Sequence, residues 1–403
     1  MSNVITKSSQ SLNNNDRIPQ ILRYLLYFYF FISFYEPFLN GILGSIMKYY
    51  IFLIMFLFLI YYRNFTIYPF HYAYIFWLAY KFISLMWTTD FWMFNATAVS
   101  QIGMVAWLIC LTGVEMDSET LKGIVNSIAI GSLSVGVLSL FFSQSYHGRV
   151  DARQVLTIFG VQSEPNNQAA YIAIGFTIFL YRLFASNKHI IFNIIAVLIN
   201  AFSVLKTGSR TGLVTLAFIA VIILLSFIRK KGITAVKGVL FAVAAIMCLY
   251  FITVKYLQVD TFERLFRFDT YEGGSNRDIL WENALELYKK GLNPIFGAGW
   301  GAYFGYNGVE KSVHNTYIGM LCDVGIIGFL AFFVPIVNAI AKLWKRHEII
   351  PICFFFSAAI PAFFIESINK RYFWNVVILL FVYYNRQIVK KKAEQKESTP
   401  YEI

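Results

Sequence analysis

The dominant pattern in the sequence is a series of apolar runs, each long enough to cross a lipid bilayer. A transmembrane helix needs about 20 mostly apolar residues, and polar turns divide the chain into runs of that kind. Twelve spans are predicted, at 21–40, 42–62, 68–87, 94–113, 121–143, 167–185, 189–205, 211–228, 233–254, 315–341, 349–366 and 372–388. The pattern therefore predicts an all-α integral membrane protein with about 12 transmembrane helices.

The basic residues of the loops predict how these spans are oriented. Lys and Arg are concentrated in the cytoplasmic loops of membrane proteins. With the N-terminus inside, the inner segments hold most of the loop Lys and Arg, including the runs at 229–231 and 390–392. An even number of spans places both termini in the cytoplasm. The expected parts are a cytoplasmic tail at 1–20, a polytopic membrane domain at 21–388 and a basic cytoplasmic tail at 389–403.

Composition supports this architecture and excludes several other classes of protein. Of the 403 residues, 58% are hydrophobic, 19% are aromatic and only 14% are charged, whereas soluble domains are about 25% charged. A soluble enzyme, a secreted disulfide scaffold and a disordered protein are therefore excluded. The net charge of +12 is explained by the orientation of the spans, so nucleic acid is not expected as a partner. The four cysteines lie singly in apolar runs, which argues against a structural metal or a disulfide framework.

Polar sequence on the predicted outer face is concentrated in two loops. The long outer loop 255–314 lies between spans nine and ten, and a shorter loop, 144–166, precedes span six. Irregular polar backbone at a membrane surface usually lines a site. Function is therefore expected in these loops and in the tight turn between spans seven and eight.

That tight turn contains the first candidate residue. Arg210 lies in the segment KTGSRTG, where Gly208 and Gly212 permit a bend and a close approach of the backbone to a ligand. The N-terminus of a helix attracts anions, so an arginine at this position predicts an anion site. The alternative is an interfacial arginine that caps the loop or reaches the lipid headgroups.

The shorter outer loop carries further candidates. Arg149 and Arg153 precede the segment SEPNN, in which Pro165 is expected at the start of a helix and Asn166 follows it. These arginines and Asn166 are candidates for contact with a substrate. A simple helix cap explains the segment around Pro165 equally well.

The long outer loop begins with a basic and aromatic segment. Arg264 and Arg267 are three residues apart, among phenylalanines and a leucine. This arrangement predicts an amphipathic helix that lies on the membrane with its basic side toward phosphates.

A second helix is expected in the same loop, at about 276–290. It places Leu280, Ala284 and Leu287 on one face and Arg277 in its first turn. A positive charge in the first turn opposes the helix dipole, so Arg277 is expected to serve a purpose other than helix stability.

The segment FGAGWG follows this helix and contains Gly297, Gly299 and Gly301. It has neither the βαβ context nor the following Lys-Ser/Thr of nucleotide-binding loops. We interpret it as a glycine-rich turn at the membrane surface.

The candidate base is a histidine at the mouth of span ten. His314 and Asn315 precede that span, and Tyr317 lies in its first turn. Imidazole titrates near neutrality and can accept a proton from a hydroxyl group; a histidine that merely caps the span is the alternative. In the last outer loop, Glu366 either lines the same cavity or pairs with the basic residues at 370–371.

Several arginines and one histidine on one face of a helical bundle predict a lipid pyrophosphate as substrate. Arginine binds phosphate oxygens in bidentate geometry and can stabilise a leaving pyrophosphate without a metal. The first outer loop offers only Glu36, which disfavours metal-dependent chemistry. No metal or other cofactor is expected.

Three segments, GSRTG, NPIFGAGWGAYF and VHNTYIGMLCDVGIIGF, resemble the O-antigen polymerase/O-antigen ligase superfamily of bacterial envelope enzymes. The resemblance is specific over about 200–330 and topological elsewhere. It implies an inverting glycosyl transfer from an undecaprenyl-pyrophosphate-linked glycan at the outer face of the bacterial inner membrane. Such a reaction needs no nucleotide sugar, ATP or metal.

The resemblance also implies roles for individual residues. Arg210 and Arg277 would bind the pyrophosphate, and His314 would deprotonate the acceptor hydroxyl. Asn315 and the glycines at 297 and 299 would shape the site. The segment SEPNN resembles the acidic-Pro-Asn element that the family carries before span six.

Four functions, three of them activities, stay open at this point. A polymerase, which joins lipid-linked repeats into O-antigen, capsular or exopolysaccharide, is preferred. A ligase would transfer the finished chain to lipid A-core. A lipid-linked oligosaccharide flippase is disfavoured because transporters tend to show related halves and midplane charges, and a scaffold without activity is the remaining alternative. The expected partners are the lipid-linked glycan as donor and acceptor, membrane lipid, and a flippase and a chain-length regulator.

Overall fold

The computed structural model describes residues 18–44, 46–61, 65–146, 153–186, 188–231, 277–304, 306–308 and 311–398. The predicted ninth span at 233–254 lies outside the described residues. The same holds for the candidates Arg149, Arg264 and Arg267. All structural statements below concern the described part of the chain.

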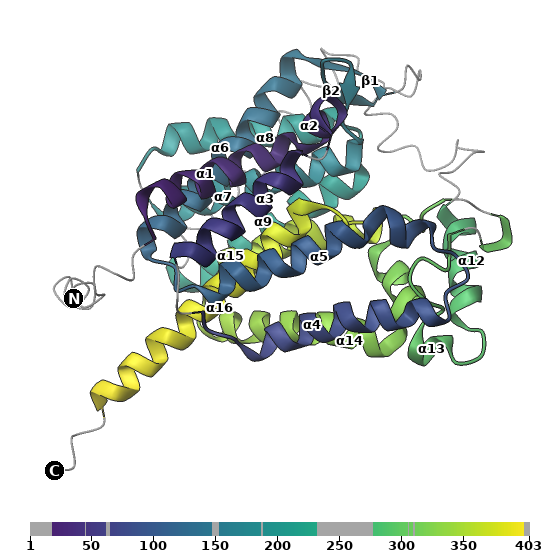
Figure 1. Cartoon of the computed structure of the whole chain (residues 1–403). Coiled ribbons are helices and arrows are strands. Elements are labelled where there is room, and N and C mark those ends of the chain that lie inside the picture. Colours follow the sequence, from purple (N-terminus) through teal and green to yellow (C-terminus); the bar gives the residue numbers. More distant parts are fainter. Residues whose placement is uncertain are drawn as a thin grey trace, which may run out of the picture.

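This part is an elongated bundle of helices, most of which run along one common direction (Figure 1). The helices are α1 (Gln20–Ile32), α2 (Glu36–Leu43), α3 (Ile46–Tyr61), α4 (Pro69–Ile83), α5 (Trp92–Gly113), α6 (Ser118–Phe141), α7 (Pro165–Ala185), α8 (Ile190–Lys206), α9 (Arg210–Lys231), α12 (Arg277–Tyr288), α13 (Asn293–Phe296), α14 (Thr316–Lys345), α15 (Ile349–Ala359) and α16 (Arg371–Ser398). Each predicted span other than the ninth coincides with helix. The mostly helical architecture is confirmed, and the count of twelve spans stays a prediction.

Five of the described helices are long and apolar enough to cross a membrane, namely α5, α6, α7, α9 and α14. Their neighbours α3, α8 and α15 are shorter apolar helices. Large apolar side chains face outward along the bundle: Phe56 is 60% exposed and Val221 is 51% exposed. Such a surface matches lipid and would be costly in water. The chain is therefore a multi-pass membrane protein.

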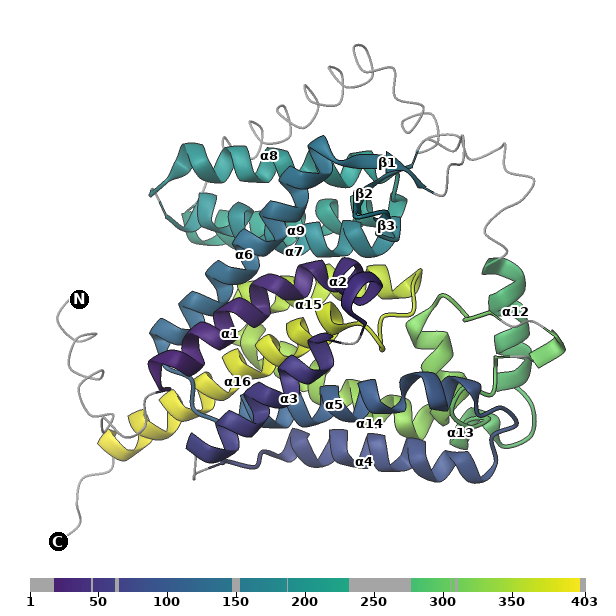
Figure 2. The same cartoon turned by 45° about the horizontal axis from the view of Figure 1, so that its top comes forward.

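The bundle has two distinct ends (Figures 1 and 2). Helices α12 and α13 lie at one end, which we call the α12 end. At the other end α1 begins at Gln20 and α16 finishes at Ser398; we call it the tail end. Candidate residues from distant parts of the sequence are at the α12 end, because α7, α9, α12 and α14 all begin there.

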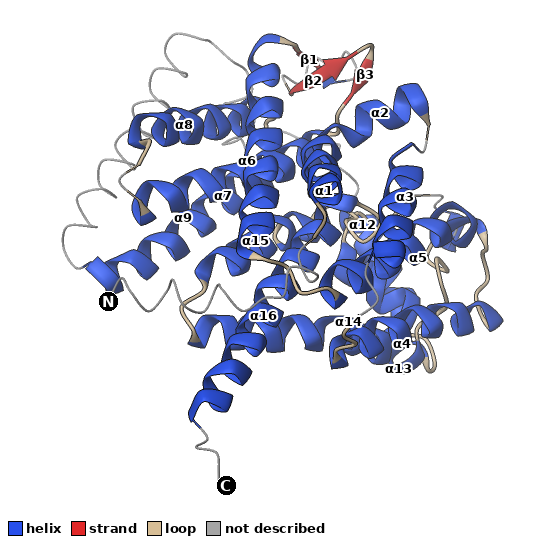
Figure 3. Ribbon diagram, turned by 60° about the vertical axis from the view of Figure 1, so that its left-hand side comes forward, coloured by secondary structure: helices blue, strands red, loops and turns tan. Residues whose placement is uncertain are grey.

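A small antiparallel sheet occupies the segment that the sequence predicted as a loop (Figure 3). Strands β1 (Ser143–Ser145), β2 (Gln154–Ile158) and β3 (Val161–Gln162) pair in that order. Phe159 and Gly160 connect β2 to β3 and both have positive φ, of 49° and 79°, as the tight hairpin turn of type I′ requires. The Gln168 side chain accepts the N–H of Leu156 at 2.8 Å, which ties the sheet to the first turn of α7.

Candidate functional site

The starts of α7 and α9 are joined by side-chain hydrogen bonds. Glu164 caps α7: its carboxylate accepts the backbone N–H of Asn167 at 2.7 Å and the side-chain amide of Asn166 at 2.8 Å. The Asn166 carbonyl oxygen in turn accepts the Ser209 hydroxyl at 2.8 Å. The predicted cap is thus present, and Asn166 also bridges two helices. Arg210, the first residue of α9, is consequently held beside the start of α7.

Arg277 begins α12, as predicted, and the apolar face of this helix is also confirmed. Leu280, Ala284 and Leu287 are buried. Trp281 lies four residues after Arg277 and therefore on the same face of the helix. Its indole N–H donates to the carbonyl of Val313 at 3.1 Å. This bond joins the first turns of α12 to the residue that precedes His314.

Arg277, His314 and Glu164 influence one another electrostatically. Burial lowers the pKa of His314, the charge of Arg277 lowers it further, and the Glu164 carboxylate acts in the opposite direction. Burial also lowers the pKa of Arg277, again opposed by Glu164. With its pKa below the usual 6.5, the imidazole is predominantly neutral at pH 7. It can therefore accept a proton.

The backbone at His314 makes the sharp turn into α14. Its φ of 51° lies in the left-handed region, which costs free energy for a residue other than glycine. Asn315 then caps the helix, since its side-chain oxygen accepts the backbone N–H groups of Tyr317 and Ile318 at 3.0 and 3.1 Å. The cap fixes the direction in which α14 leaves this turn.

The glycine-rich segment at 297–301 forms a turn, as predicted, and this turn is buried against α14. A kink at Gly325, with φ 57° and ψ −166°, interrupts α14. The N–H of Ala298 donates to the carbonyl of Cys322 at 2.7 Å, and the next N–H donates to that of Asp323 at 3.2 Å. A Cβ at Gly297 would lie 2.3 Å from the backbone carbonyl oxygen of Asp323. Glycine is therefore required for this approach of two backbones.

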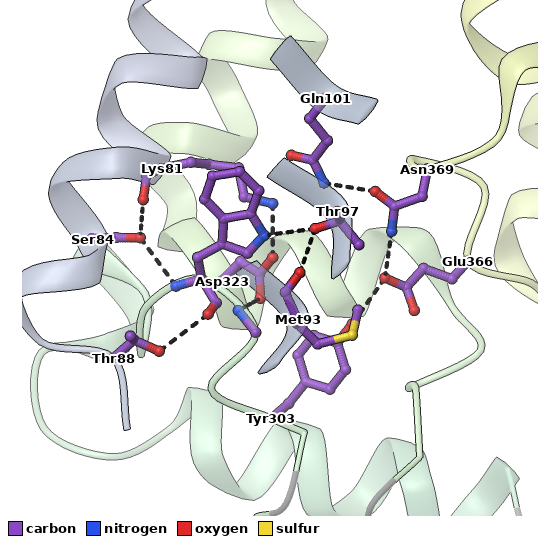
Figure 4. Close-up of polar contacts among 12 residues, drawn as sticks. Lys81, Ser84, Thr88, Met93, Thr97, Gln101, Tyr303, Asp323, Glu366 and Asn369 are labelled. Atoms are coloured by element: carbon purple, nitrogen blue, oxygen red, sulfur yellow. Dashed lines mark hydrogen bonds and ion pairs between the residues drawn. The ribbon is translucent and has the colours of Figure 1, made fainter. Parts of the chain in front are cut away.

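A buried ion pair holds the same turn from its other side (Figure 4). The Lys81 ammonium on α4 lies 3.0 Å from the Asp323 carboxylate, and their side chains are only 2% and 10% exposed. The N–H of Gly301 donates to the second oxygen of Asp323 at 2.8 Å. The Trp300 ring centroid lies 4.3 Å from the ammonium. Lys81 falls within the predicted span 68–87, and an ionisable residue in such an apolar run is itself a signal of function that could have identified it.

Glu366 lies at the edge of this network (Figure 4). Its carboxylate accepts the hydroxyl of Tyr303 at 2.9 Å and the side-chain amide of Asn369 at 3.4 Å. Burial raises the pKa of the Glu366 carboxyl. Arg371, one of the basic residues considered as a partner of Glu366, forms an ion pair with Glu36 at the start of α2. The carboxylate of Glu366 and the guanidinium of Arg371 thus contact different parts of the protein.

The remaining candidates have structural contacts of their own. The Tyr317 hydroxyl donates to the carbonyl of Ala359 at 2.7 Å and joins α14 to α15. The Arg153 carbonyl, just before β2, accepts the N–H of Tyr146 at 2.8 Å. Among the described residues, no cluster of three or more His, Cys, Asp or Glu side chains could hold a metal ion.

Comparison with models of protein families gives a match within the chain. The model of a family described as O-antigen ligase matches residues 195–333, and no curated protein matches the chain significantly. The matched segment contains Arg210, Arg277 and His314 together with the glycine-rich turn. The expected resemblance is thereby confirmed for this segment: residues 195–333 match the O-antigen ligase family model, which is consistent with the O-antigen polymerase/O-antigen ligase superfamily.

Proposed function

We propose that this protein is a membrane glycosyltransferase that polymerises undecaprenyl-pyrophosphate-linked repeat units into O-antigen, capsular or exopolysaccharide. The reaction takes place at the α12 end, on the outer face of the bacterial cytoplasmic membrane. One observation carries the proposal: within the matched segment, the imidazole of His314 is half-buried and lies within electrostatic reach of Arg277 and Glu164. This arrangement supplies a neutral base beside a cation that suits a phosphate.

In the proposed reaction, His314 takes the proton of an acceptor sugar hydroxyl. The hydroxyl oxygen attacks the anomeric carbon of the donor sugar from the face opposite the pyrophosphate. The bond between that carbon and the pyrophosphate oxygen breaks, so the configuration inverts and the lipid pyrophosphate leaves with the bonding electrons. Arg210 and Arg277 stabilise its charge, and the imidazolium later returns its proton to water.

The positions of helix starts support the anion-binding part of this proposal. Arg210 begins α9 beside the capped start of α7, and the N-terminus of a helix favours negative charge. Arg277 begins α12. The bridging Asn166 would border this basic region, and Arg149, Arg264 and Arg267, which lie outside the described residues, remain candidates for contact with the pyrophosphate.

Arg277 has a second effect in this scheme, because its charge lowers the pKa of His314 in the free protein. A bound pyrophosphate would offset that charge. The pKa of the imidazole would then rise toward its usual value, and the base would be stronger when donor is present. Proton uptake would thus be linked to occupancy of the donor site.

A ligase is the second candidate, and the description of the matching family model favours it. A ligase would use the same donor and the same base but a different acceptor, lipid A-core. The distinction therefore depends on the acceptor supplied and not on the residues of the site.

The test is to incubate the purified protein in nanodiscs with a single lipid-pyrophosphate-linked repeat unit and EDTA, and to separate the products on a gel. A ladder of repeats supports a metal-independent polymerase. Transfer only to added lipid A-core identifies a ligase. An intact repeat unit in both mixtures overturns the enzyme assignment and favours a flippase or a scaffold.

A further inference from the structure

A second cationic site lies at the tail end, far from His314. A cavity of about 300 Å³ opens there between α6, α7 and α16. Three cations from the three helices line it, Lys122, Arg182 and Arg386, and none of its lining residues is acidic. Figures 1 and 2 place this junction near the end of the bundle from which α16 projects.

The cavity wall on α6 is a single stripe of polar side chains. Ser118, Lys122 and Asn126 are four residues apart in succession and so share one face of the helix. Two of them hold the arginines of the neighbouring helices: Arg182 donates to the Asn126 side-chain oxygen at 2.5 Å, and Arg386 donates to the Ser118 hydroxyl. Both acceptors are neutral. They orient the guanidinium groups without compensating their charge.

Three acidic residues nearby are engaged elsewhere, and a fourth, Glu115, shares a smaller neighbouring pocket with Arg386 but does not line this cavity. Asp117 and Glu119 both pair with Arg23, at 3.4 and 2.9 Å. Glu348 accepts the side-chain amide of Gln387 at 2.7 Å. The Tyr383 hydroxyl, which lines the cavity, lies within electrostatic reach of Arg182, Arg386 and Glu348. A cytoplasmic bias of basic residues explains why cations occur at this end, but it does not explain why three of them converge on one cavity.

We propose that this cavity binds a phosphate group, namely that of an anionic phospholipid headgroup in the leaflet at the tail end. Each arginine presents a planar fork that matches phosphate oxygens. The apolar side chains of Leu121 and Val125 complete the lining, and basic pockets between transmembrane helices suit anionic headgroups. Ser118 begins α6 and Arg182 lies in the last turn of α7. The site is thus at the depth of the headgroups.

The test uses the full chain in detergent, with phosphatidylglycerol, phosphatidylcholine and inorganic phosphate as separate probes. Native mass spectrometry counts retained lipids, and thermal unfolding measures stabilisation. We expect retention of phosphatidylglycerol and a raised unfolding temperature, with little effect of phosphatidylcholine. Equal stabilisation by inorganic phosphate, without lipid retention, would support the phosphate site but identify a soluble ligand. Equal effects of the two lipids would overturn the proposal.

Matched variants locate the binding. Arg182→Gln and Lys122→Gln each remove a cation from the cavity, whereas Arg346→Gln removes an exposed one at the same end. We expect roughly tenfold weaker phosphatidylglycerol binding for Arg182→Gln, a smaller loss for Lys122→Gln and none for Arg346→Gln. Because Lys122 is exposed, its variant keeps the test valid if Arg182→Gln fails to fold. Indistinguishable binding by Lys122→Gln and Arg346→Gln would refute the assignment.

Discussion

Two histidines flank α14, and they share a backbone conformation but not an environment. His314 precedes the helix with φ 51°, and His347 follows it with φ 59°. His347 is exposed at the tail end, where its N–H donates to the carbonyl of Trp344 at 3.0 Å and helps to terminate the helix. His314 is half-buried near Arg277 and Glu164. A residue with a left-handed backbone conformation therefore only marks the end of a helix. The charged residues around His314 are what indicate a catalytic role.

The largest effect on the transfer rate should come from replacing these two histidines one at a time. Asparagine tolerates the left-handed region, so His314→Asn and His347→Asn should both fold. Loss of a general base typically costs roughly 10²- to 10⁴-fold in rate. We expect that loss in repeat-unit transfer for His314→Asn and wild-type transfer for His347→Asn, measured on the same gel. Equal activities would remove the functional distinction between the two ends of α14.

The two ends of α14 also differ in the burial of their charged residues. Near the first end, Asp323 on α14 is paired with a lysine of α4. Lys81 pairs with Asp323 inside the protein, whereas Lys345 is exposed at the opposite end. Removing one partner of a buried pair costs about 3–5 kcal/mol, while an exposed substitution changes stability by only about 0.5 kcal/mol. Lys81→Met should therefore lower the thermal unfolding temperature markedly, and Lys345→Met should not.

A double variant shows whether the loss of stability in Lys81→Met comes from an unpaired charge or from lost packing. If the uncompensated carboxylate is the cause, Asp323→Asn added to Lys81→Met should restore part of the lost stability. Additive losses would indicate that the side chains act independently through packing.

A smaller loss of transfer rate, compared with His314→Asn, is expected for Arg277→Lys. The lysine keeps the charge but not the bidentate geometry. One lost charge-assisted hydrogen bond corresponds to roughly 10- to 100-fold in transfer rate. Arg346→Lys, at the tail end of α14, is the control and should transfer at the wild-type rate. A fully active Arg277→Lys variant would contradict bidentate recognition of pyrophosphate.

The subtlest effect concerns pH. The neutral imidazole is the active form, and burial and Arg277 hold the pKa of His314 below 6.5. At low donor concentration, where kcat/KM reports the free protein, transfer should therefore persist at pH 6.5 and decline as pH falls through that lowered pKa. Glu164→Gln removes an influence that raises the pKa, so the acidic limb should move to lower pH. Arg277→Gln removes one that lowers it and should move the limb to higher pH. Profiles normalised to each variant's maximum test both directions.

The sequence predicts the local features of this molecule well. Helix positions follow from apolar runs, and the starts of α7 at Pro165 and of α12 at Arg277 follow from residues within a few positions of each other. The contacts that assemble the site are not local. Lys81 and Asp323 lie on α4 and α14, and Glu36 and Arg371 on α2 and α16. A single sequence holds no periodicity that pairs such positions.

The hairpin of β2 and β3 was missed for a related reason. Its strands are short, and β3 contains only Val161 and Gln162, so no clear alternation of apolar and polar residues develops. The Phe159-Gly160 turn also lacks the Asn-Gly or Asp-Gly pair that usually predicts such a connection. The burial of the glycine-rich turn could not be predicted either, because it depends on the kink of α14.

That kink has a consequence for how the chain can vary in length. A Cβ at Gly325 would lie 2.3 Å from the carbonyl oxygen of Ile295, and the amides of Ala298 and Gly299 match two successive carbonyls of α14. One residue inserted beside Ala298 or Gly325 would shift this correspondence by a full position, and no change of side chain could restore it. Between homologous chains, insertions and deletions should therefore be excluded from these two short stretches even where the amino acids themselves differ.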